Sequence, residues 1–238
     1  MDLNLSQPIN GPFFLGHKIS TKSDADMLQE IYSLRYQVYC LECGFLPPGS
    51  YPSRLESDEY DADAAHFYTS NQRDEVVGYV RLVGADNTGV FPLDSFCPDL
   101  FENRTRPAPK YCAEISRLMV HQNYRRRQGD ILQGLNLAPE TTDDTGRRHS
   151  NKPQILLSLY RQMYQHSLNN GIRYWYAAME RSLARALSRM DFVFEPIGPQ
   201  IDYFGPVTPY IADLRVLEER LAQSSPELLA WFEDFQRQ

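Results

Sequence analysis

The stretch Tyr111-Cys112-Ala113-Glu114-Ile115-Ser116-Arg117-Leu118-Met119-Val120 predicts a β-strand that carries two charged side chains where a buried strand is normally apolar. Burying Glu114 or Arg117 without a partner would cost several kcal/mol, which is comparable with the net stability of a whole domain. We therefore expect the two side chains to be paired with other charges, to be held for chemistry, or both. The rest of the chain can be interpreted as the scaffold around this strand.

The spacing of Glu114 and Arg117 leads to a second prediction about the strand. Side chains of a regular strand alternate between its two faces, so residues an odd number of positions apart point to opposite faces. Both side chains can line one pocket only if the strand is bulged or bent between them. We therefore predict a bulge or a splay between residues 115 and 121.

Length and charge place the chain, which has 238 residues, among ordinary globular proteins. The formal net charge of −7 disfavours nucleic acid or an anionic membrane as a partner. No apolar run reaches the ~18 residues that a transmembrane helix needs. The first residues, MDLNLSQPINGPFFLG, lack the basic start and long apolar core of a secretory signal. We expect a cytoplasmic protein without a transmembrane segment.

The cysteines predict no metal site. Cys40 and Cys43 form a C-x-x-C pair, but the sequence has no second pair that would complete a zinc ribbon. We expect the cysteines to be reduced thiols that pack as small apolar side chains.

Apolar spacing and turn residues predict one α/β (α+β) domain over residues 1–238, with a mixed central sheet and helices on both faces. An irregular N-terminal arm is expected over residues 1–22, and a flexible insertion over residues 128–152. The expected helices are 23–43, 153–169, 181–190 and 215–237, the last interrupted near 224–226, and the expected strands are 66–69, 76–83, 111–120, 173–179, 191–196 and 207–214.

Charged residues elsewhere in the chain could pair with the two in the quoted strand. They are Arg35, Arg81, Glu56, Asp58 and Asp61, and with Glu114 and Arg117 they form a nearly balanced set. We therefore expect a partly buried charge cluster. A structural network that pins the first helix and the acidic loop to the sheet is favoured for Arg81 and Glu56. For Asp58, Asp61 and Arg117, positioning of a zwitterionic amine substrate is nearly as well supported.

The order and spacing of these residues resemble those of the GNAT-type acyltransferases, and among them the acyl-homoserine lactone (autoinducer) synthases and the N-acyl amino acid synthases. The matching positions within residues 30–120 are Arg35, Tyr39 and Phe45 for R-x-x-x-F-x-x-x-x-x-W, Glu56, Asp58 and Asp61 for E-x-D-x-x-D, Arg81 for a strand arginine, and Glu114 and Arg117 for E-x-x-R. The segment IGPQIDYFGPVTPYIADL, residues 197–214, is similar to acyltransferases associated with exosortase/PEP-CTERM systems. The resemblance depends on the order of the motifs, because each one alone is short.

The resemblance implies a GNAT fold and an N-acyltransferase. Such an enzyme would move a fatty acyl group from the phosphopantetheine of an acyl carrier protein, or from acyl-CoA, to an amino acid or related small amine. Acyl transfer needs a base, because an α-amino group with a pKa of ~8 is mostly protonated at pH 7. Glu114 is the candidate base, and the alternative left open is an ion pair between Glu114 and an arginine. The candidate catalytic set is completed by Arg117, Asp58, Asp61, Arg35 and Arg81.

Binding residues are implied in the same way. Free backbone N–H groups near Met119 and Val120 would bind the pantetheine chain and the developing oxyanion, a role typically worth ~3 kcal/mol per donor. The candidate substrate-binding residues are Tyr39, Phe45, Glu56, Ser116, Met119 and Val120, and the candidate carrier- or CoA-binding residues are Arg125, Arg126 and Arg127. No tightly bound cofactor is expected.

Two departures from the family pattern bear on the substrates. Tyr39 and Phe45 replace the Phe and Trp that help to enclose S-adenosylmethionine in autoinducer synthases, which disfavours that substrate. The GNAT pyrophosphate-binding loop is not intact at residues 125–129, which favours a carrier-protein thioester over free acyl-CoA. The alternatives are a signal synthase that uses S-adenosylmethionine, and a GNAT-fold module that binds acyl thioesters without turnover.

Overall fold

The computed structural model describes residues 15–19, 24–97, 99–102, 104–124, 141–142, 148–149, 152–203 and 205–234. The strands are β1 (Leu15–Ile19), β2 (Ala65–Ser70), β3 (Val76–Val83), β4 (Cys112–Val120), β5 (Thr141–Thr142), β6 (Arg148–His149), β7 (Tyr174–Met179), β8 (Glu195–Pro196), β9 (Ile201–Asp202) and β10 (Pro206–Asp213). The α-helices are α1 (Ala25–Arg35), α2 (Lys152–Asn169), α3 (Arg181–Ser188), α4 (Leu214–Ser224) and α5 (Pro226–Glu233). Shorter helical segments are the π-helix η1 (Tyr36–Glu42) and the 3-10 turns η2 (Pro48–Ser50), η3 (Pro92–Ser95), η4 (Pro109–Tyr111) and η5 (Gln122–Tyr124).

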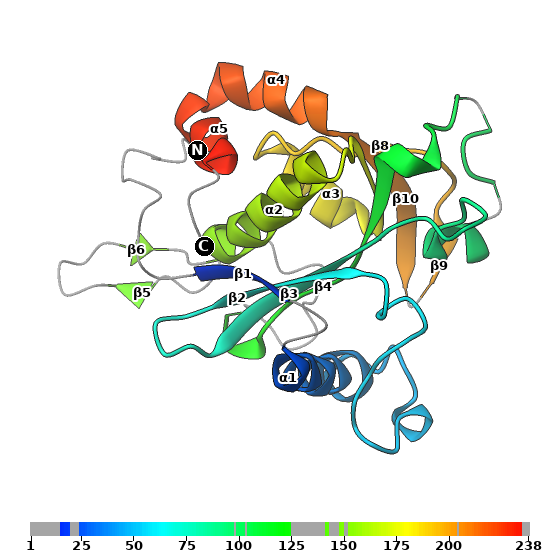
Figure 1. Ribbon diagram of the computed structural model, residues 1–238, viewed down its shortest axis with the longest axis vertical. Coiled ribbons are helices and arrows are strands. Elements are labelled where there is room, and N and C mark those ends of the chain that lie inside the picture. The colour runs from blue at the N-terminus through cyan, green and yellow to red at the C-terminus, as the bar shows by residue number, and fades with distance from the viewer. Residues whose placement is uncertain are drawn as a thin grey trace.

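The described strands form an eight-stranded mixed sheet in the order β1-β2-β3-β4-β7-β10-β8, with β9 paired to β10. Strands β4 and β7 are parallel, and the other pairs in this sheet are antiparallel. A parallel pair needs a crossover, and here α2 carries the chain from β4 to β7 across one face of the sheet (Figure 1). The middle of the sheet is therefore the place where β4 and β7 meet.

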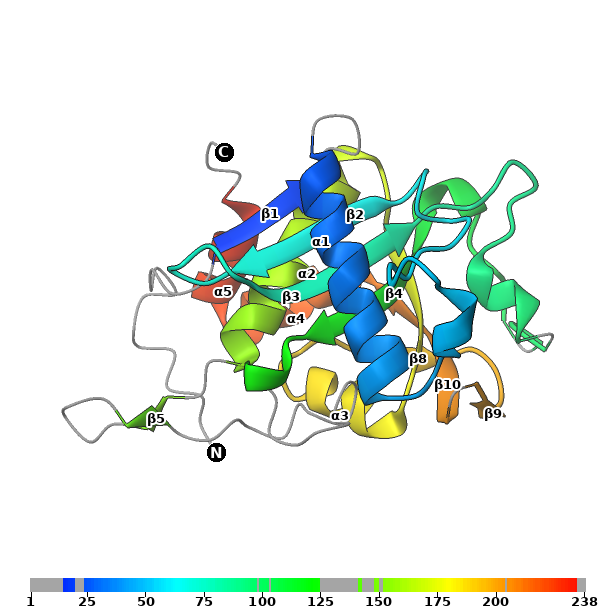
Figure 2. The same ribbon diagram turned by 90° about the horizontal axis from the view of Figure 1, so that it is seen from below.

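Helices cover both faces of the sheet, and each face has its own apolar core. Helix α2 packs on β1, β2 and β3, and α4 and α5 lie beyond it (Figure 1). The core on this side includes Phe67, Val80 and Ile115. Helix α1 crosses the opposite face (Figure 2), where Tyr79 and Met119 belong to a smaller core. The two cores follow the period-2 alternation of the strands.

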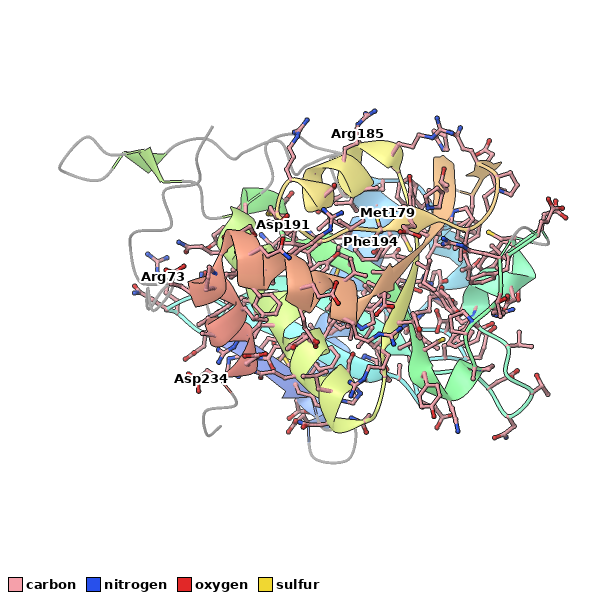
Figure 3. All side chains as sticks on the ribbon, turned by 90° about the horizontal axis from the view of Figure 1, so that it is seen from above. Arg73, Met179, Arg185, Asp191, Phe194 and Asp234 are labelled. Atoms are coloured by element: carbon pink, nitrogen blue, oxygen red, sulfur yellow. The ribbon has the colours of Figure 1, made fainter. Side chains whose placement is uncertain are left out.

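The far half of the sheet is closed by α3 and the residues that follow it. Met179, which ends β7, and Phe194 both belong to the larger core. Figure 3 shows them on the inner side of α3, whereas Arg185 projects outward from the same helix. The end of β7 is therefore held by apolar packing against the residues that follow α3.

Strand β3 places a charge in the middle of the sheet. All of its residues, VVGYVRLV, are buried. Because Arg81 has apolar neighbours along the strand, the side chain is carried inside with them and is only 1% exposed. A buried guanidinium must have charged partners, and these partners define the candidate site.

The predicted fold class is confirmed: a mixed sheet carries helices on both faces. The predicted hairpin is β2–β3, the predicted charged strand is β4, and the interrupted C-terminal helix is the pair α4 and α5. None of the described helices is long and apolar enough to cross a membrane.

Three predicted segments differ from the structure. The arm over residues 1–22 is wrong in part, since β1 forms there by pairing with β2, which is remote in sequence and leaves no local pattern. The strand over 191–196 shrinks to β8, and the first helix changes at Arg35 into the π-helix η1. Most of the insertion over 128–152 lies outside the described residues, apart from the paired strands β5 and β6 and the first residue of α2.

Candidate active site

Strand β4 is bulged at Arg117. Tyr79 of β3 pairs with Met119 of β4, and Arg81 pairs with Ser116. Between these pairs β3 has one residue, Val80, whereas β4 has two, residues 117–118. Arg117 has a φ of 55°, in the left-handed region that costs roughly 1–2 kcal/mol for a residue with a Cβ. The predicted bulge between residues 115 and 121 is confirmed. It turns Arg117 toward the same group of charges that Arg81 contacts.

Strands β4 and β7 separate directly after Glu114. Their parallel register runs from Cys112 opposite Tyr174 to Glu114 opposite Tyr176, and the described strands pair no further. Beyond this point β4 continues to Val120, while β7 continues beside β10. The facing edges of the two strands are thus unpaired with each other, and such an edge can bind the backbone-like amides of an extended ligand.

Arginines of α1 and β3 share the acids of the loop that precedes β2. Arg35 Nε lies 2.6 Å from Glu56 Oε2, and its Nη1 lies 2.6 Å from Asp61 Oδ1. Arg81 Nη1 lies 2.5 Å from Asp58 Oδ1 and 2.6 Å from Asp61 Oδ1. Helix α1 and β3 are therefore joined through a loop that contributes only carboxylates, and the expected charge cluster is confirmed.

Arg117 completes this group of ion pairs at its outer end. The group, called the ion network below, consists of Arg35, Arg81, Arg117, Glu56, Asp58 and Asp61. Its Nη2 lies 3.0 Å from both Glu56 Oε1 and Asp58 Oδ2. The side chains of Arg117 and Asp58 are 20% and 17% exposed, whereas those of Arg35 and Glu56 are fully buried. A ligand can therefore reach the network at Arg117 and Asp58, while its inner members are enclosed.

The arginines keep the network acids ionised. Burial alone would raise the pKa of Glu56, but hydrogen bonds from Arg35 and Arg117 outweigh it, and the pKa is lowered. The same balance lowers the pKa values of Asp58 and Asp61. With three guanidinium groups and three carboxylates, the network has little net charge of its own.

Glu114 lies apart from the network and has a different partner. Its side chain is buried, and its Oε2 accepts a hydrogen bond of 2.8 Å from the backbone N–H of Leu93 in η3. Among the described residues it has no ion pair within 4.0 Å, so the ion pair weighed as an alternative role is not seen there. The carboxyl is held by a neutral donor at the position where β4 leaves β7.

Burial raises the pKa of Glu114 to about 8, although the Leu93 N–H and the nearby charges of Arg81 and Arg117 lower it. A carboxyl group with such a pKa releases and accepts a proton near neutral pH. This value is closer to that of an amine than the ordinary 4.5 of a glutamate, and a smaller difference favours proton transfer between the two groups. A buried carboxyl with a raised pKa, held where two strands separate, is a candidate for acid–base chemistry.

Tyr39 of η1 covers the bulge. Its hydroxyl donates to the carbonyl of Leu118 at 3.3 Å, and the guanidinium carbon of Arg117 lies 5.5 Å from the centre of its ring. Burial raises the pKa of this hydroxyl to about 12, so it remains a donor. The Phe45 ring lies 6.4 Å from the Tyr39 ring. The π-helix thus brings two predicted substrate-binding residues to the outer end of the network.

The other predicted residues occupy different positions. The Ser116 hydroxyl accepts a hydrogen bond of 2.9 Å from Arg81 Nε. Met119 is buried in the core beneath α1, and Val120 is half-buried against the larger core. Arg125, Arg126 and Arg127 lie outside the described residues. Of the predicted binding residues in β4, the structure shows a polar partner for the side chain of Ser116 only.

Several residues near the site were missed at the sequence level. His66 and Tyr79 are fully buried beneath the network, on the same sheet face as Arg81. Period-2 alternation from Arg81 could have found both, because His66 is opposite Arg81 in the hairpin and Tyr79 precedes it by one alternation. The N–H of Leu93 could not have been found, since a backbone donor leaves no mark in the sequence.

Aromatic rings from two distant segments also lie near the site. Phe96, which follows η3, stacks on Tyr203 with ring centres 4.1 Å apart. Burial raises the pKa of Tyr203, and the charges of Arg117 and Glu114 also act on this phenol. Tyr203 belongs to residues 197–214, the segment whose resemblance to exosortase-associated acyltransferases was noted in the sequence. Through Tyr203 this segment approaches the same site as the N-terminal motifs.

The cysteines are not part of this arrangement. Cys40, Cys97 and Cys112 are buried thiols, and Tyr176 donates a hydrogen bond of 3.3 Å to the sulfur of Cys112. Within the described ranges, no group of three or more His, Cys, Asp or Glu side chains could hold a metal ion.

Comparisons with known proteins find similarity over the part of the chain that contains these residues. Residues 34–133 match the sequence model of the acetyltransferase (GNAT) domain. The chain is 25% identical over 193 residues to the acyl-homoserine-lactone synthase of Aliivibrio fischeri. The aligned region covers 79% of this chain and 86% of that protein. The segment 34–133, which matches the GNAT domain model, includes every member of the ion network and Glu114.

Solved structures show the same fold at lower identity. TofI in a ternary complex with an inhibitor and MTA has a TM-score of 0.63 at 18% identity, and covers 90% of this chain and 96% of its own. The CoA-dependent acyl-homoserine lactone synthase BjaI, with SAM and isopentyl-CoA, has a TM-score of 0.60 at 22% identity, and covers 92% and 98%. FeeM, an N-acyl amino acid synthase from uncultured soil microbes, has a TM-score of 0.53 at 15% identity, and covers 94% and 100%.

Proposed function

We propose, from the premise that this chain is an acyltransferase with a GNAT domain, that it transfers a fatty acyl group from a thioester to the amine of an amino acid or related small amine. The observation that carries the proposal is Glu114, a buried carboxyl with a pKa raised to about 8, at the divergence of β4 and β7. The donor is the phosphopantetheine thioester of an acyl carrier protein, or acyl-CoA.

The chemistry assigns Glu114 as the base. Its carboxylate accepts a proton from the ammonium group of the acceptor, directly or through one water molecule. The neutral nitrogen attacks the thioester carbonyl and the C–N bond forms. The C–S bond breaks, the nitrogen gives up a second proton to the sulfur, which leaves as the thiol, and the proton on Glu114 is released to solvent. Backbone N–H groups on the open edge of β4 near Met119 and Val120 bind the oxyanion and the pantetheine chain.

The exposed end of the ion network orients the acceptor. Arg117 binds the acceptor carboxylate and Asp58 faces its ammonium group, because these are the members that solvent reaches. Arg35, Arg81 and Asp61 hold Asp58 in position, and Glu56 holds Arg117. The remaining proposed substrate contacts are Tyr39 and Phe45, whereas Glu56 and Ser116 act by holding Arg117 and Arg81. Arg125, Arg126 and Arg127 are proposed to bind the carrier protein.

Product analysis tests the proposal. The purified protein is incubated with acyl carrier protein thioesters of several chain lengths and with the twenty amino acids, and N-acyl products are identified by mass spectrometry. A parallel reaction with acyl-CoA of matched chain length separates the two donors. Absence of any N-acyl product over all chain lengths and acceptors would overturn the proposal.

A second candidate is a signal synthase that takes S-adenosylmethionine as the amine. The identity with the Aliivibrio fischeri acyl-homoserine-lactone synthase favours it, whereas Tyr39 and Phe45 at the aromatic positions of the motif do not. Incubation with S-adenosylmethionine and the acyl donor distinguishes the two candidates. This synthase would release methylthioadenosine and an acyl lactone, and the amino acid acyltransferase would release neither.

A further inference from the structure

His66 and Tyr79 form a line of hydrogen bonds beneath the ion network, from the carbonyl of Asp61 through His66 to Tyr79. Both side chains are fully buried, and they come from neighbouring strands β2 and β3. His66 Nε2 lies 2.8 Å from the carbonyl oxygen of Asp61, and His66 Nδ1 lies 2.7 Å from the hydroxyl of Tyr79. A carbonyl oxygen can only accept, so Nε2 carries a hydrogen. Burial and the charges of Arg35 and Arg81 lower the pKa of the ring, which favours the neutral imidazole. In the neutral tautomer with its hydrogen on Nε2, Nδ1 accepts from the Tyr79 hydroxyl.

This line of hydrogen bonds is continuous with the groups that face the acceptor. The Asp61 carboxylate accepts from Arg35 and Arg81, and its second oxygen accepts a hydrogen bond of 2.8 Å from the backbone N–H of Asp58. His66 thus holds the Asp61 carbonyl while the arginines hold its carboxylate. Asp58, the next acid along this chain of contacts, is one of the two exposed members.

We propose that His66 and Tyr79 are positioning residues for the amine acceptor: they orient Asp61, and through it they fix Asp58 and the guanidinium of Arg35. The inference rests on the proposed function for the identity of the ligand. Neither residue touches the acceptor. Simple packing would not require this arrangement, because an apolar pair would fill the space without a polar partner at each nitrogen.

The charges around His66 keep it in the required form. Burial lowers the pKa of His66, and the charges of Arg35 and Arg81 lower it further, whereas the carbonyl and carboxylate of Asp61 raise it. With Tyr79, these are the titratable and charged groups that face the ring among the described residues. A protonated imidazole would reverse the hydrogen bond with Tyr79, because Nδ1–H would then donate to the phenol oxygen, and it would add a third cation beside two guanidinium groups.

The test separates acceptor binding from donor binding and from folding. We expect Tyr79→Phe, which removes one hydroxyl from a buried site, to raise the KM for the amino acid identified in the product screen about tenfold. The KM for the acyl donor and kcat should stay within about twofold. His66→Phe should behave like Tyr79→Phe, and His66→Gln should restore most of the loss because its amide can donate to Asp61 and accept from Tyr79.

Matched controls come from the opposite face of the sheet. His166 of α2 packs edge-on against Phe67 of β2, 5.4 Å between ring centres, and Tyr160 is buried in the larger core. His166→Gln and Tyr160→Phe should leave the acceptor KM unchanged. An unchanged acceptor KM in folded Tyr79→Phe, or equal changes in both KM values, would overturn the inference.

A measurement without turnover keeps the inference separate from the proposed function. In the wild-type protein, nitrogen NMR of the imidazole at pH 6.5 should show His66 neutral with its hydrogen on Nε2. A hydrogen on Nδ1, or a protonated ring, would overturn the positioning pair even if the enzyme is active. A correct tautomer in a protein that makes no N-acyl product would instead overturn the proposed function alone.

Discussion

Glu56 and Glu114 are the same residue type, both are buried, and both belong to the charged side of the central sheet, yet their surroundings differ. Glu56 accepts from Arg35 at 2.6 Å and from Arg117 at 3.0 Å, and its pKa is lowered. Glu114 accepts from the Leu93 N–H, and its pKa is raised to about 8. Burial is therefore not what sets the direction of the pKa shift in these two acids. The charge of the hydrogen-bond partner decides it.

The comparison assigns different tasks to the two regions. In the ion network, every acid is ionised and paired, so it can orient a charged ligand but cannot take up a proton near neutral pH. At Glu114, the neutral donor fixes the carboxyl without stabilising its charge enough to offset burial. Substitutions in the network should therefore change stability and acceptor binding, whereas substitution of Glu114 should change turnover.

The largest expected effect comes from breaking the network at its buried centre. Arg35→Met removes the guanidinium that contacts Glu56 and Asp61 and leaves two buried carboxylates short of a partner. We expect the free energy of unfolding to fall by about 3–5 kcal/mol, as measured by urea denaturation at pH 7.

An exposed ion pair gives the matched control. Arg215 lies 2.6 Å from Asp213, but its side chain is 57% exposed. Arg215→Met should cost less than about 1 kcal/mol, because water screens the pair. A loss for Arg35→Met no larger than that of Arg215→Met would contradict the structural role of the network.

The next effect sharpens the comparison from the other side. Glu114→Gln keeps the shape of the side chain and an oxygen for the Leu93 N–H, but it cannot accept the proton. We expect kcat to fall about a hundredfold, with a much smaller change in the acceptor KM. Glu195→Gln, at an exposed surface pair with Arg104, should leave kcat unchanged. An unchanged kcat in Glu114→Gln would exclude Glu114 as the base.

The pH dependence of kcat and of stability, in the wild type and in Glu114→Gln, tests whether the raised pKa of Glu114 is the cause. In the proposed mechanism the carboxylate form of Glu114 is the base, so wild-type kcat should rise with pH and level off above about 8. Because the folded pKa of Glu114 lies above its ordinary 4.5, the folded state holds an extra proton between these values, and this term reduces stability as pH rises from about 4.5 to about 8. Glu56, with a lowered pKa, loses its contribution as pH falls below 4.5. Glu114→Gln should remove the first slope and leave the second.

The two regions were not equally predictable from the sequence. The charge cluster could be predicted because it consists of side chains whose opposite charges and spacing are visible, and the bulge because Glu114 and Arg117 break the alternation of β4. The environment of Glu114 could not, since it depends on a backbone N–H in η3 that the fold brings to β4. Strand β1 and the π-helix were missed for a related reason, because tertiary pairing and packing override weak local preference there.

The smallest expected effect tests where the network ends. Ser116 accepts from Arg81 Nε at 2.9 Å, so Ser116→Ala leaves a donor of a buried guanidinium without its partner. We expect a loss of about 1–2 kcal/mol in the free energy of unfolding, against less than about 0.5 kcal/mol for Ser224→Ala, whose hydroxyl is exposed. Because the Ser116 hydroxyl is already bound to Arg81, the acceptor KM should stay within about twofold. A tenfold or greater rise in this KM at unchanged stability would instead place Ser116 among the groups that contact the substrate, and the boundary between the two regions would then lie at Arg81.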